Sequence, residues 1–476
     1  MAIVVESKKA CAVNPLKMSQ PLGAAFAFMG LGSCMPLMHG SQGCTSFGLV
    51  LLVRHFREAI PLQTTAMNEV TTILGGMENL EQAILNIRKR AQPRIIAICS
   101  TGLTETKGDD VDGFLELIRA RHPDLADTAL VYVSTPDYVG GFEDGWARAV
   151  TAVVRALARP APVRERCRVN LLPAWHTTAA DIDELREICA DFGLETSVLP
   201  DVSGSLDGHI PDDWSGTTLG GTTLRDIEGL GRAAMTLALG EPMRSAAMEI
   251  EIRAGVPYVV FDRLCGLLAV DRLMCTLAEI SGRAVPAKYT RQRSQLQDAM
   301  LDAHFFLGQA RIAIAAEPDL LWSVGSLMAD MGAELVACVT TANSAQLARL
   351  PGDEVVIGDL EDFERAAAAA GANLLMAHSH GKQAAKRLGL PLYRIGLPLF
   401  DRLGNAHRLA VGYRGTRALL CDVGNMLIDA APHHGPQSWP LPAASVAAAA
   451  PLRKGADCGG SCACSPIRPD TMEHTS

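Results

Sequence analysis

The sequence places one cysteine where its thiolate could bind a metal. In His39-Gly40-Ser41-Gln42-Gly43-Cys44-Thr45, two glycines flank polar residues just before a cysteine that opens an apolar helix over residues 47–53. The amide groups at a helix N-terminus favour a thiolate, and glycine lets a bulky inorganic cluster approach the backbone closely. A small buried core cysteine after a tight turn would leave the same pattern, so both interpretations stay open at this level.

The other cysteines do not complete a ligand set around Cys44. A [4Fe-4S] cluster normally takes four thiolates, and the 13 cysteines of the chain show no second group with such spacing. Any cluster at Cys44 must therefore be shared with another subunit. Cys458, Cys462 and Cys464, near the C-terminus, could hold iron or zinc transiently, but an incidental role is the simpler hypothesis.

Two histidines form a further candidate metal pair. His378 and His380 end an apparent strand, where side chains two residues apart point the same way and could ligate a metal. The sequence offers no third ligand beside them. We therefore expect them to serve as structural hydrogen-bonding groups.

Common catalytic motifs are absent. The sequence holds neither a G-x-x-x-x-G-K-[ST] phosphate loop nor a G-x-G-x-x-G turn between a strand and a helix, which disfavours ATP hydrolysis by this chain. It also lacks the H-E-x-x-H metal helix and the G-x-S-x-G nucleophile elbow. A zinc protease or a simple hydrolase is accordingly disfavoured.

Composition narrows the class of protein. The chain has 476 residues, of which 48% are hydrophobic and 20% charged, as expected of a globular protein with several cores. Its formal charge of −9 and the lack of a concentrated basic segment argue against nucleic acid as a partner. Irregularly spaced cysteines favour a reducing, cytoplasmic location. The uncharged stretch between Lys17 and His39 contains several Gly and Pro residues, so we expect a short buried helix over residues 22–29 and then an apolar loop, not a membrane span.

Short apolar runs alternate with helical patterns from about residue 94 onward, which predicts parallel βαβ units. The helical patterns include residues 141–158 and 178–192, and the predicted strands are residues 94–100, 129–134, 168–173, 195–200, 333–339, 354–357 and 373–378. Ligands of open α/β sheets bind outside the carboxyl ends of strands, so the following loops are where chemistry is expected.

Changes in composition predict the domain organisation. A Pro-rich step at residues 159–162 and a charged segment at 288–297 suggest boundaries. We expect an N-terminal α/β domain over residues 1–160 that carries the Cys44 loop, a second over 161–287 and a third over 288–432. Residues 433–476 form a low-complexity, Cys-containing tail whose composition is typical of a flexible segment.

Longer motifs carry a family resemblance. Pro61-Leu62-Gln63-Thr64-Thr65-Ala66-Met67, Thr101-Gly102-Leu103-Thr104-Glu105-Thr106 and the segments 200–209, 291–300 and 358–362 resemble the nitrogenase component 1 family. Within it they are most similar to β-type subunits of the scaffold that assembles the iron-molybdenum cofactor. The resemblance spans nearly the whole chain to about residue 430, and it implies three Rossmann-like, doubly wound domains with parallel sheets.

The same resemblance implies a set of ligands. The catalytic β subunit of the family supplies three cysteines to its iron-sulfur cluster, and the positions that match the other two are Ser19 and Gly102 here. Only Cys44 remains, which fits a [4Fe-4S] cluster held by one cysteine of this chain and three of an α-type partner. Cys99 lies three residues before Gly102 and is interpreted as core packing.

The resemblance also implies partners and a function. It indicates an α2β2 heterotetramer with an α-type, NifE-like scaffold subunit, an iron-molybdenum cofactor precursor held by the complex, and contacts with the nitrogenase iron protein and a precursor-delivering protein. The charged residues Arg54, His55, Arg57 and Glu58 would lie near the subunit interface, without a catalytic role. The chain would be a maturase subunit and not an enzyme by itself. The alternatives are a catalytic oxidoreductase subunit of nitrogenase or of a protochlorophyllide reductase-like complex, and a structural partner without a cluster.

Overall fold

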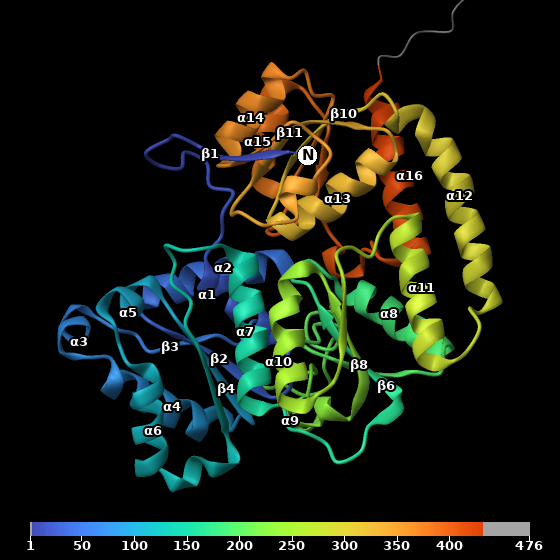
Figure 1. Cartoon of the computed structure of the whole chain (residues 1–476). Coiled ribbons are helices and arrows are strands. Elements are labelled where there is room, and N and C mark those ends of the chain that lie inside the picture. Colours follow the sequence, from blue (N-terminus) through green and yellow to red (C-terminus); the bar gives the residue numbers. More distant parts are fainter. Residues whose placement is uncertain (1, 432–476) are drawn as a thin grey trace, which may run out of the picture. The chain divides into compact units, whose positions relative to one another are not determined.

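The computed structural model describes residues 2–431, and within them the strands pair in three parallel sheets (Figure 1). The first sheet has the order β3 (Gln63–Thr64), β2 (Cys34–His39), β4 (Ile95–Ser100), β5 (Ala129–Val133). The second has the order β7 (Glu195–Val198), β6 (Glu165–Pro173), β8 (Ala233–Leu239), β9 (Tyr258–Phe261). The third has the order β1 (Ile3–Glu6), β12 (Glu354–Ile357), β11 (Glu334–Thr340), β10 (Arg311–Ala315), β13 (Leu374–Ala377), β14 (Leu392–Arg394).

Helices connect the strands, as parallel pairing requires. The α-helices are α1 (Gln20–Met29), α2 (Gln42–Phe56), α3 (Glu69–Leu74), α4 (Met77–Ala91), α5 (Gly102–Lys107), α6 (Val111–Arg121), α7 (Phe142–Leu157), α8 (Ala179–Asp191), α9 (Leu224–Glu228), α10 (Arg244–Ala254), α11 (Leu267–Ser281), α12 (Ala287–Leu307), α13 (Pro318–Asp330), α14 (Leu360–Ala369), α15 (Lys382–Leu388) and α16 (Gly412–Ala430). Short 3-10 turns are η1 (Pro123–Asp127), η2 (Gly229–Arg232), η3 (Glu241–Met243), η4 (Leu347–Arg349), η5 (Ser379–Gly381) and η6 (Asn405–His407).

The seven strands predicted from apolar runs are confirmed as β4, β5, β6, β7, β11, β12 and β13. The predicted buried helix is α1, but the apolar loop expected after it is wrong. Residues 34–39 instead form β2, which lies between β3 and β4 and is buried along its whole length. Pro36 disfavours a central strand because it lacks an amide hydrogen, yet it is held in register with Ala97 of β4. The two-residue β3 pairs only with Leu37 and Met38.

Two glycines let α1 and α7 pack backbone to backbone. A Cβ at Gly23 would lie 1.9 Å from the Phe142 carbonyl oxygen, and one at Gly145 would lie 2.0 Å from the Gln20 carbonyl oxygen. No side chain fits at such separations. The contact fixes α1, all of whose residues are buried, beside the first sheet.

The first strand does not join the nearest sheet in sequence. β1 pairs in parallel with β12, with Ile3 in register with Glu354, so the start of the chain completes an edge of the third sheet. A boundary at residue 160 does not anticipate this pairing, and the four domain ranges remain a proposal. The helices α12 and α16 lie side by side near the third sheet, as do α7 and α10 near the second (Figure 1).

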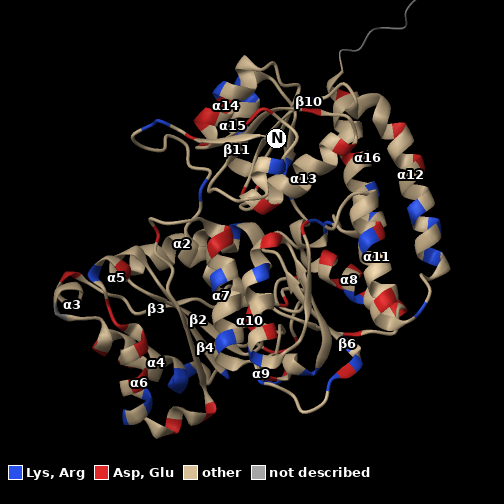
Figure 2. Cartoon of the chain, viewed as in Figure 1, with Lys and Arg blue, Asp and Glu red and all other residues tan. Residues whose placement is uncertain are grey.

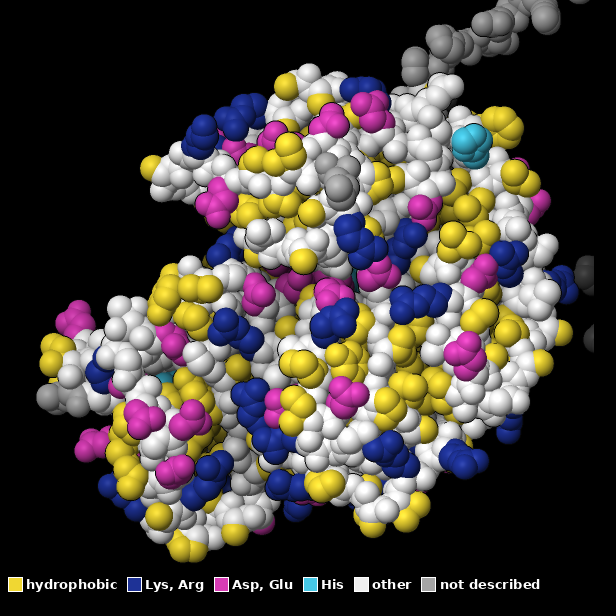
Figure 3. Space-filling view, viewed as in Figure 1, with side chains coloured by type: hydrophobic (Ala, Val, Ile, Leu, Met, Phe, Trp, Pro, Cys, Tyr) yellow, Lys and Arg dark blue, Asp and Glu magenta, His cyan; other side chains and the backbone are white. Residues whose placement is uncertain are grey.

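Charged side chains are distributed over many elements. Lys and Arg alternate with Asp and Glu along the exposed helices, and hydrophobic side chains lie between them on the face in view (Figures 2 and 3). None of the described helices has both the length and the apolar character needed to cross a membrane.

Candidate metal centre

Cys44 lies in the first turn of α2. β2 ends at His39, Ser41 is the extended N-cap residue of α2, and Cys44 is the third residue of the helix. Its side chain is exposed, and its Sγ lies 3.6 Å from Oγ of Ser41. The predicted helix is confirmed but begins two residues before Cys44, at Gln42, and the alternative of a buried core cysteine is wrong.

Close packing against the loop after β4 holds the Cys44 loop in place. The hydroxyls of Thr101 and Thr104 both donate to the carbonyl oxygen of His39, each at 3.1 Å. A Cβ at Gly40 would lie only 2.2 Å from Oγ1 of Thr101, so this position requires glycine. The Gly40 amide in turn donates to Oγ1 of Thr65 at 3.0 Å. The loops after β2 and β4 therefore meet at one edge of the first sheet, as parallel pairing dictates.

Positions 19 and 102 offer no sulfur at that edge. Ser19 is the N-cap residue of α1, and Gly102 is the first residue of α5, directly after β4. The Gly102 amide donates to Oδ2 of Asp137 at 2.9 Å, from the segment that follows β5. Burial raises the pKa of Asp137, while the hydrogen bond from Gly102 opposes the rise.

Cys99 is a core residue, as predicted. It is fully buried in β4, with its Sγ 3.7 Å from the carbonyl oxygen of Pro21 and 3.9 Å from that of Leu37. Burial raises the pKa of its thiol, which keeps the sulfur protonated and unsuited to ligation.

The histidine pair does not form a metal site. β13 ends at Ala377, so His378 and His380 belong to the turn around η5 and not to a strand. Nδ1 of His378 accepts a hydrogen bond from the His380 amide at 3.3 Å, and burial lowers the pKa of His378 to about 4. One ring nitrogen of His378 therefore takes the expected hydrogen-bonding role, whereas its Nε2 is buried without a partner among the described residues. Within residues 2–431, no group of three or more His, Cys, Asp or Glu side chains could hold a metal ion. Cys458, Cys462 and Cys464 lie outside the described residues.

The face of α2 beside Cys44 is apolar and exposed. Phe47 is 69% exposed and Val50 is 53% exposed, one and two turns after the cysteine, whereas Leu51 and Leu52 are buried. A Cβ at Gly43 would approach nothing closer than Oγ of Ser41, at 3.9 Å. Space for a bulky group is therefore open next to the thiol.

The charged cluster at the end of α2 makes contacts within the chain. The Arg54 guanidinium lies 4.2 Å from the centre of the Phe400 ring, and Nδ1 of His55 accepts a hydrogen bond from the Leu399 amide at 2.9 Å. Burial lowers the pKa of His55 to about 4. Glu58 accepts a hydrogen bond from the Gly208 amide at 2.9 Å. These contacts fix the C-terminal end of α2 against the segment after β14, and Glu58, just beyond the helix, against the segment after β7.

A buried carboxylate cluster was not foreseen from the sequence. Oε2 of Glu143 accepts hydrogen bonds from the Asp319 amide at 2.9 Å and from Nε1 of Trp175 at 3.2 Å. Glu317, which begins α13, accepts a hydrogen bond from the Thr341 hydroxyl at 2.7 Å. Burial raises the pKa of Glu317 to about 7, and burial together with the neighbouring Asp319 and Glu317 raises that of Glu143. These residues are far apart in the chain, and no local motif marks them.

Comparison with known proteins decides the family. The family model described as nitrogenase component 1 type oxidoreductase matches residues 19–428. The chain belongs to this family. The nitrogenase iron-molybdenum cofactor biosynthesis protein NifN of Bradyrhizobium diazoefficiens is 57% identical over 90% of this chain and 92% of that protein. The protein of the same name from a Nostoc species is 51% identical over 90% of this chain and 96% of that protein.

Solved structures described as nitrogenase share the fold. A structure described as nitrogenase Cp1 at pH 6.5 superposes with a TM-score of 0.84 at 30% identity, and the match covers 89% of this chain and 95% of that one. A second chain, from a structure described as nitrogenase Cp1 at pH 5, shows the fold alone, with a TM-score of 0.68 at 13% identity. The predicted fold of three Rossmann-like parallel α/β units is confirmed.

Proposed function

We propose that the chain is the β-type subunit of the scaffold complex on which an iron-sulfur precursor is matured to the nitrogenase iron-molybdenum cofactor. Identity of 57% over nine-tenths of a protein named for biosynthesis of this cofactor carries the proposal. The exposed thiol at the start of α2 supports it, because the family resemblance implies that a scaffold subunit of this type contributes one ligand to a shared cluster.

Cys44 is proposed as one ligand of a [4Fe-4S] cluster at the interface with the α-type partner. The residues around Cys44 fit such a cluster, because the thiol is exposed, the space at Gly43 is open and exposed apolar side chains follow along α2. The cluster would supply electron transfer at the interface, while this chain's residues hold the ligand loop. The other three thiolates must come from the partner, because a [4Fe-4S] cluster normally takes four.

The remaining assignments follow from this role. The partner is an α-type, NifE-like subunit in an α2β2 heterotetramer, and the complex receives the precursor from a delivering protein and contacts the nitrogenase iron protein. The location is cytoplasmic. A catalytic nitrogenase subunit is disfavoured, because Ser19 and Gly102 replace two of the cysteines that the resemblance implies for the catalytic β subunit. A protochlorophyllide reductase-like subunit is disfavoured by the longer motifs, which resemble those of the scaffold subunit.

A pair of cysteine variants tests the ligand. In heterotetramer purified without oxygen, Cys44→Ala is expected to lower the iron content and remove the EPR signal of the reduced interface cluster. Cys99→Ala is the matched control and is expected to cost about 1 kcal/mol of stability without loss of iron. A full iron content and unchanged signal in Cys44→Ala would refute the ligand assignment. A wild-type complex without any interface cluster would favour the purely structural partner.

A further inference from the structure

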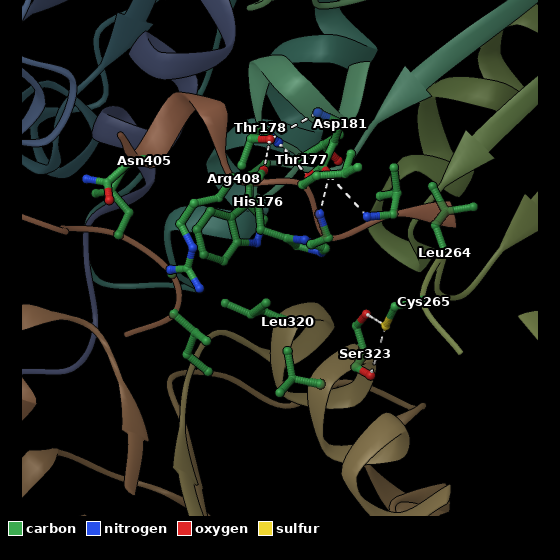
Figure 4. A pocket seen from close by; sticks show the side chains of 18 of the residues that line it. His176, Thr177, Thr178, Asp181, Leu264, Cys265, Leu320, Ser323, Asn405 and Arg408 are labelled. Carbon is green, nitrogen blue, oxygen red and sulfur yellow. Dashed lines mark hydrogen bonds between the residues drawn. The ribbon is translucent and has the colours of Figure 1, made fainter. Parts of the chain in front are cut away.

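A cavity lies between the carboxyl ends of strands of the second sheet and those of the third sheet. Its volume is about 240 Å³. It is lined by segments that follow β6, β8, β9 and β14 and by the first turn of α13, which follows β10 (Figure 4). A single water needs roughly 10–15 Å³ of such volume, so a small organic molecule fits and a protein segment does not. Open α/β sheets bind ligands at this end of their strands.

The lining is mostly apolar with a few polar groups, as in small-molecule sites. Trp175, Phe56, Leu264 and Leu320 supply apolar surface. Figure 4 shows Cys265 turned toward Ser323, with its Sγ 3.3 Å from the serine Oγ. It is the one thiol among the lining residues. A lone, hydrogen-bonded thiol does not provide the donor set of a metal cluster.

The arginines of the lining have unused donors. Arg408 forms no ion pair with any carboxylate in the described residues, and it donates only to the Tyr393 hydroxyl at 2.6 Å and to the Arg394 carbonyl oxygen at 2.8 Å. Arg394 has a side chain that is 10% exposed, and its Nε has no partner although its other nitrogens bind Asp401 and Leu392. Arg263 also has an unpartnered buried nitrogen, Nη1.

The buried carboxylates that line the same cavity already accept hydrogen bonds from groups of this chain. Asp181 accepts hydrogen bonds from the amides of Ala410 and Val411, at 2.7 and 3.1 Å. Asp319 accepts from His176 and from Gln346, both at 3.0 Å. Asp262 lies 3.8 Å from Arg349, and Asp422 is exposed. Among the described residues that line the cavity, two arginine nitrogens and one acceptor, Oδ1 of Asn405, are buried without a hydrogen-bond partner.

We propose that this cavity binds a small organic carboxylate, with Arg408 as the residue that pairs with its charge. A guanidinium matches a carboxylate through two parallel N–H donors, and an unpaired guanidinium inside an apolar cavity gains most from such a ligand. The site is distinct from the Cys44 loop, and the proposal does not rest on the function proposed above.

Calorimetric titration of the purified complex with acetate, succinate and citrate at constant ionic strength tests the proposal. At least one of these anions is expected to bind once per copy of this chain, and the uncharged succinamide is expected to bind at least tenfold more weakly than succinate. Arg408→Met in this chain is expected to weaken binding about tenfold or more, because a charge-assisted pair is lost. Arg402→Met, an exposed arginine that does not line the cavity, is the matched control and is expected to change binding less than twofold.

A second variant keeps the test informative if Arg408→Met fails to fold. Leu320→Phe adds volume at the cavity wall and is expected to weaken binding while Arg408 is intact. Any one of four results would overturn the proposal: none of the anions binds, Arg402→Met loses as much binding as Arg408→Met, succinamide binds as tightly as succinate, or binding is unchanged in Arg408→Met. A metal found in this cavity by anomalous diffraction would overturn it as well.

Discussion

The backbone amide of Gly102 donates to the carboxylate of Asp137, and this carboxylate occupies the space into which a side chain at position 102 would project. The hydrogen bond is 2.9 Å long, and a Cβ at Gly102 would lie 3.0 Å from Oδ2 of Asp137. A side chain at position 102, which the family resemblance matches to a cluster cysteine, would thus meet this polar contact. A cysteine at position 102 would require Asp137 to move, so the packing at this edge of the sheet favours glycine there.

This contact predicts that Gly102→Cys will not restore a ligand. The new side chain must displace Asp137, so we expect a loss of about 1 kcal/mol in stability and no gain of iron in the anaerobically purified complex. The double variant Gly102→Cys with Asp137→Ala is expected to recover part of the loss. Thermal denaturation and iron counting check both results, and extra iron in the single variant would contradict the explanation.

The glycine contact between α1 and α7 predicts a strong effect of one methyl group. Gly145→Ala would place Cβ 2.0 Å from the Gln20 carbonyl oxygen, so the helices must separate, and we expect a loss of about 3 kcal/mol or more. Gly424→Ala in α16 is the control, because a Cβ there meets nothing within 4 Å. It is expected to stabilise by about 0.5–1 kcal/mol through helix propensity. Similar denaturation midpoints for the two variants would show that α1 and α7 do not touch this closely.

The raised pKa of Glu317 predicts that its burial makes the folded chain less stable as the pH rises. Burial raises its folded-state pKa from 4.5 to about 7, so between these values the folded chain keeps a proton that the unfolded chain has released. The free energy of unfolding therefore decreases as the pH rises from 4.5, and the full decrease, up to about 3 kcal/mol, is reached above pH 7. Glu317→Gln should match the wild type near pH 5 and be more stable at pH 8 in urea denaturation. Glu116→Gln, at an exposed position of α6 without an ion pair among the described residues, is the control for the substitution itself.

Much of the fold is predictable from sequence because strands such as β4 and β5 are continuous apolar runs bounded by polar residues. β2 was missed because Pro36 and the preceding glycines indicate a loop, and only its burial between β3 and β4 overrides that local preference. β8 and β10 were missed because short apolar runs rich in Ala do not distinguish a strand from a buried helix.

The candidate site was predictable to the extent that it is local. The glycines and the helix start around Cys44 lie within seven residues, so the sequence alone places a cysteine near a helix N-terminus, but it does not distinguish an exposed thiol from a buried one. Asp137 at Gly102, and Asp319 at Glu143, are contacts between segments that only the tertiary fold brings together. The same holds for Arg408 and its cavity. No periodicity or motif records such pairs.

The lowered pKa of His378 predicts that folding stability depends on pH in the opposite sense from the effect of Glu317. Burial lowers its folded-state pKa from 6.5 to about 4, so between these values the unfolded chain binds a proton that the folded chain excludes. The stability contribution is complete above pH 6.5 and is lost as the pH falls toward 4, by up to about 3 kcal/mol. In His378→Asn the amide oxygen can still accept the hydrogen bond from the His380 amide, but nothing titrates. We therefore expect urea denaturation to show a smaller loss between pH 7 and pH 5 for this variant than for the wild type. His304→Asn, on the exposed side of α12, should follow the wild-type profile, and an equal acid loss in wild type and His378→Asn would assign the acid sensitivity to other groups.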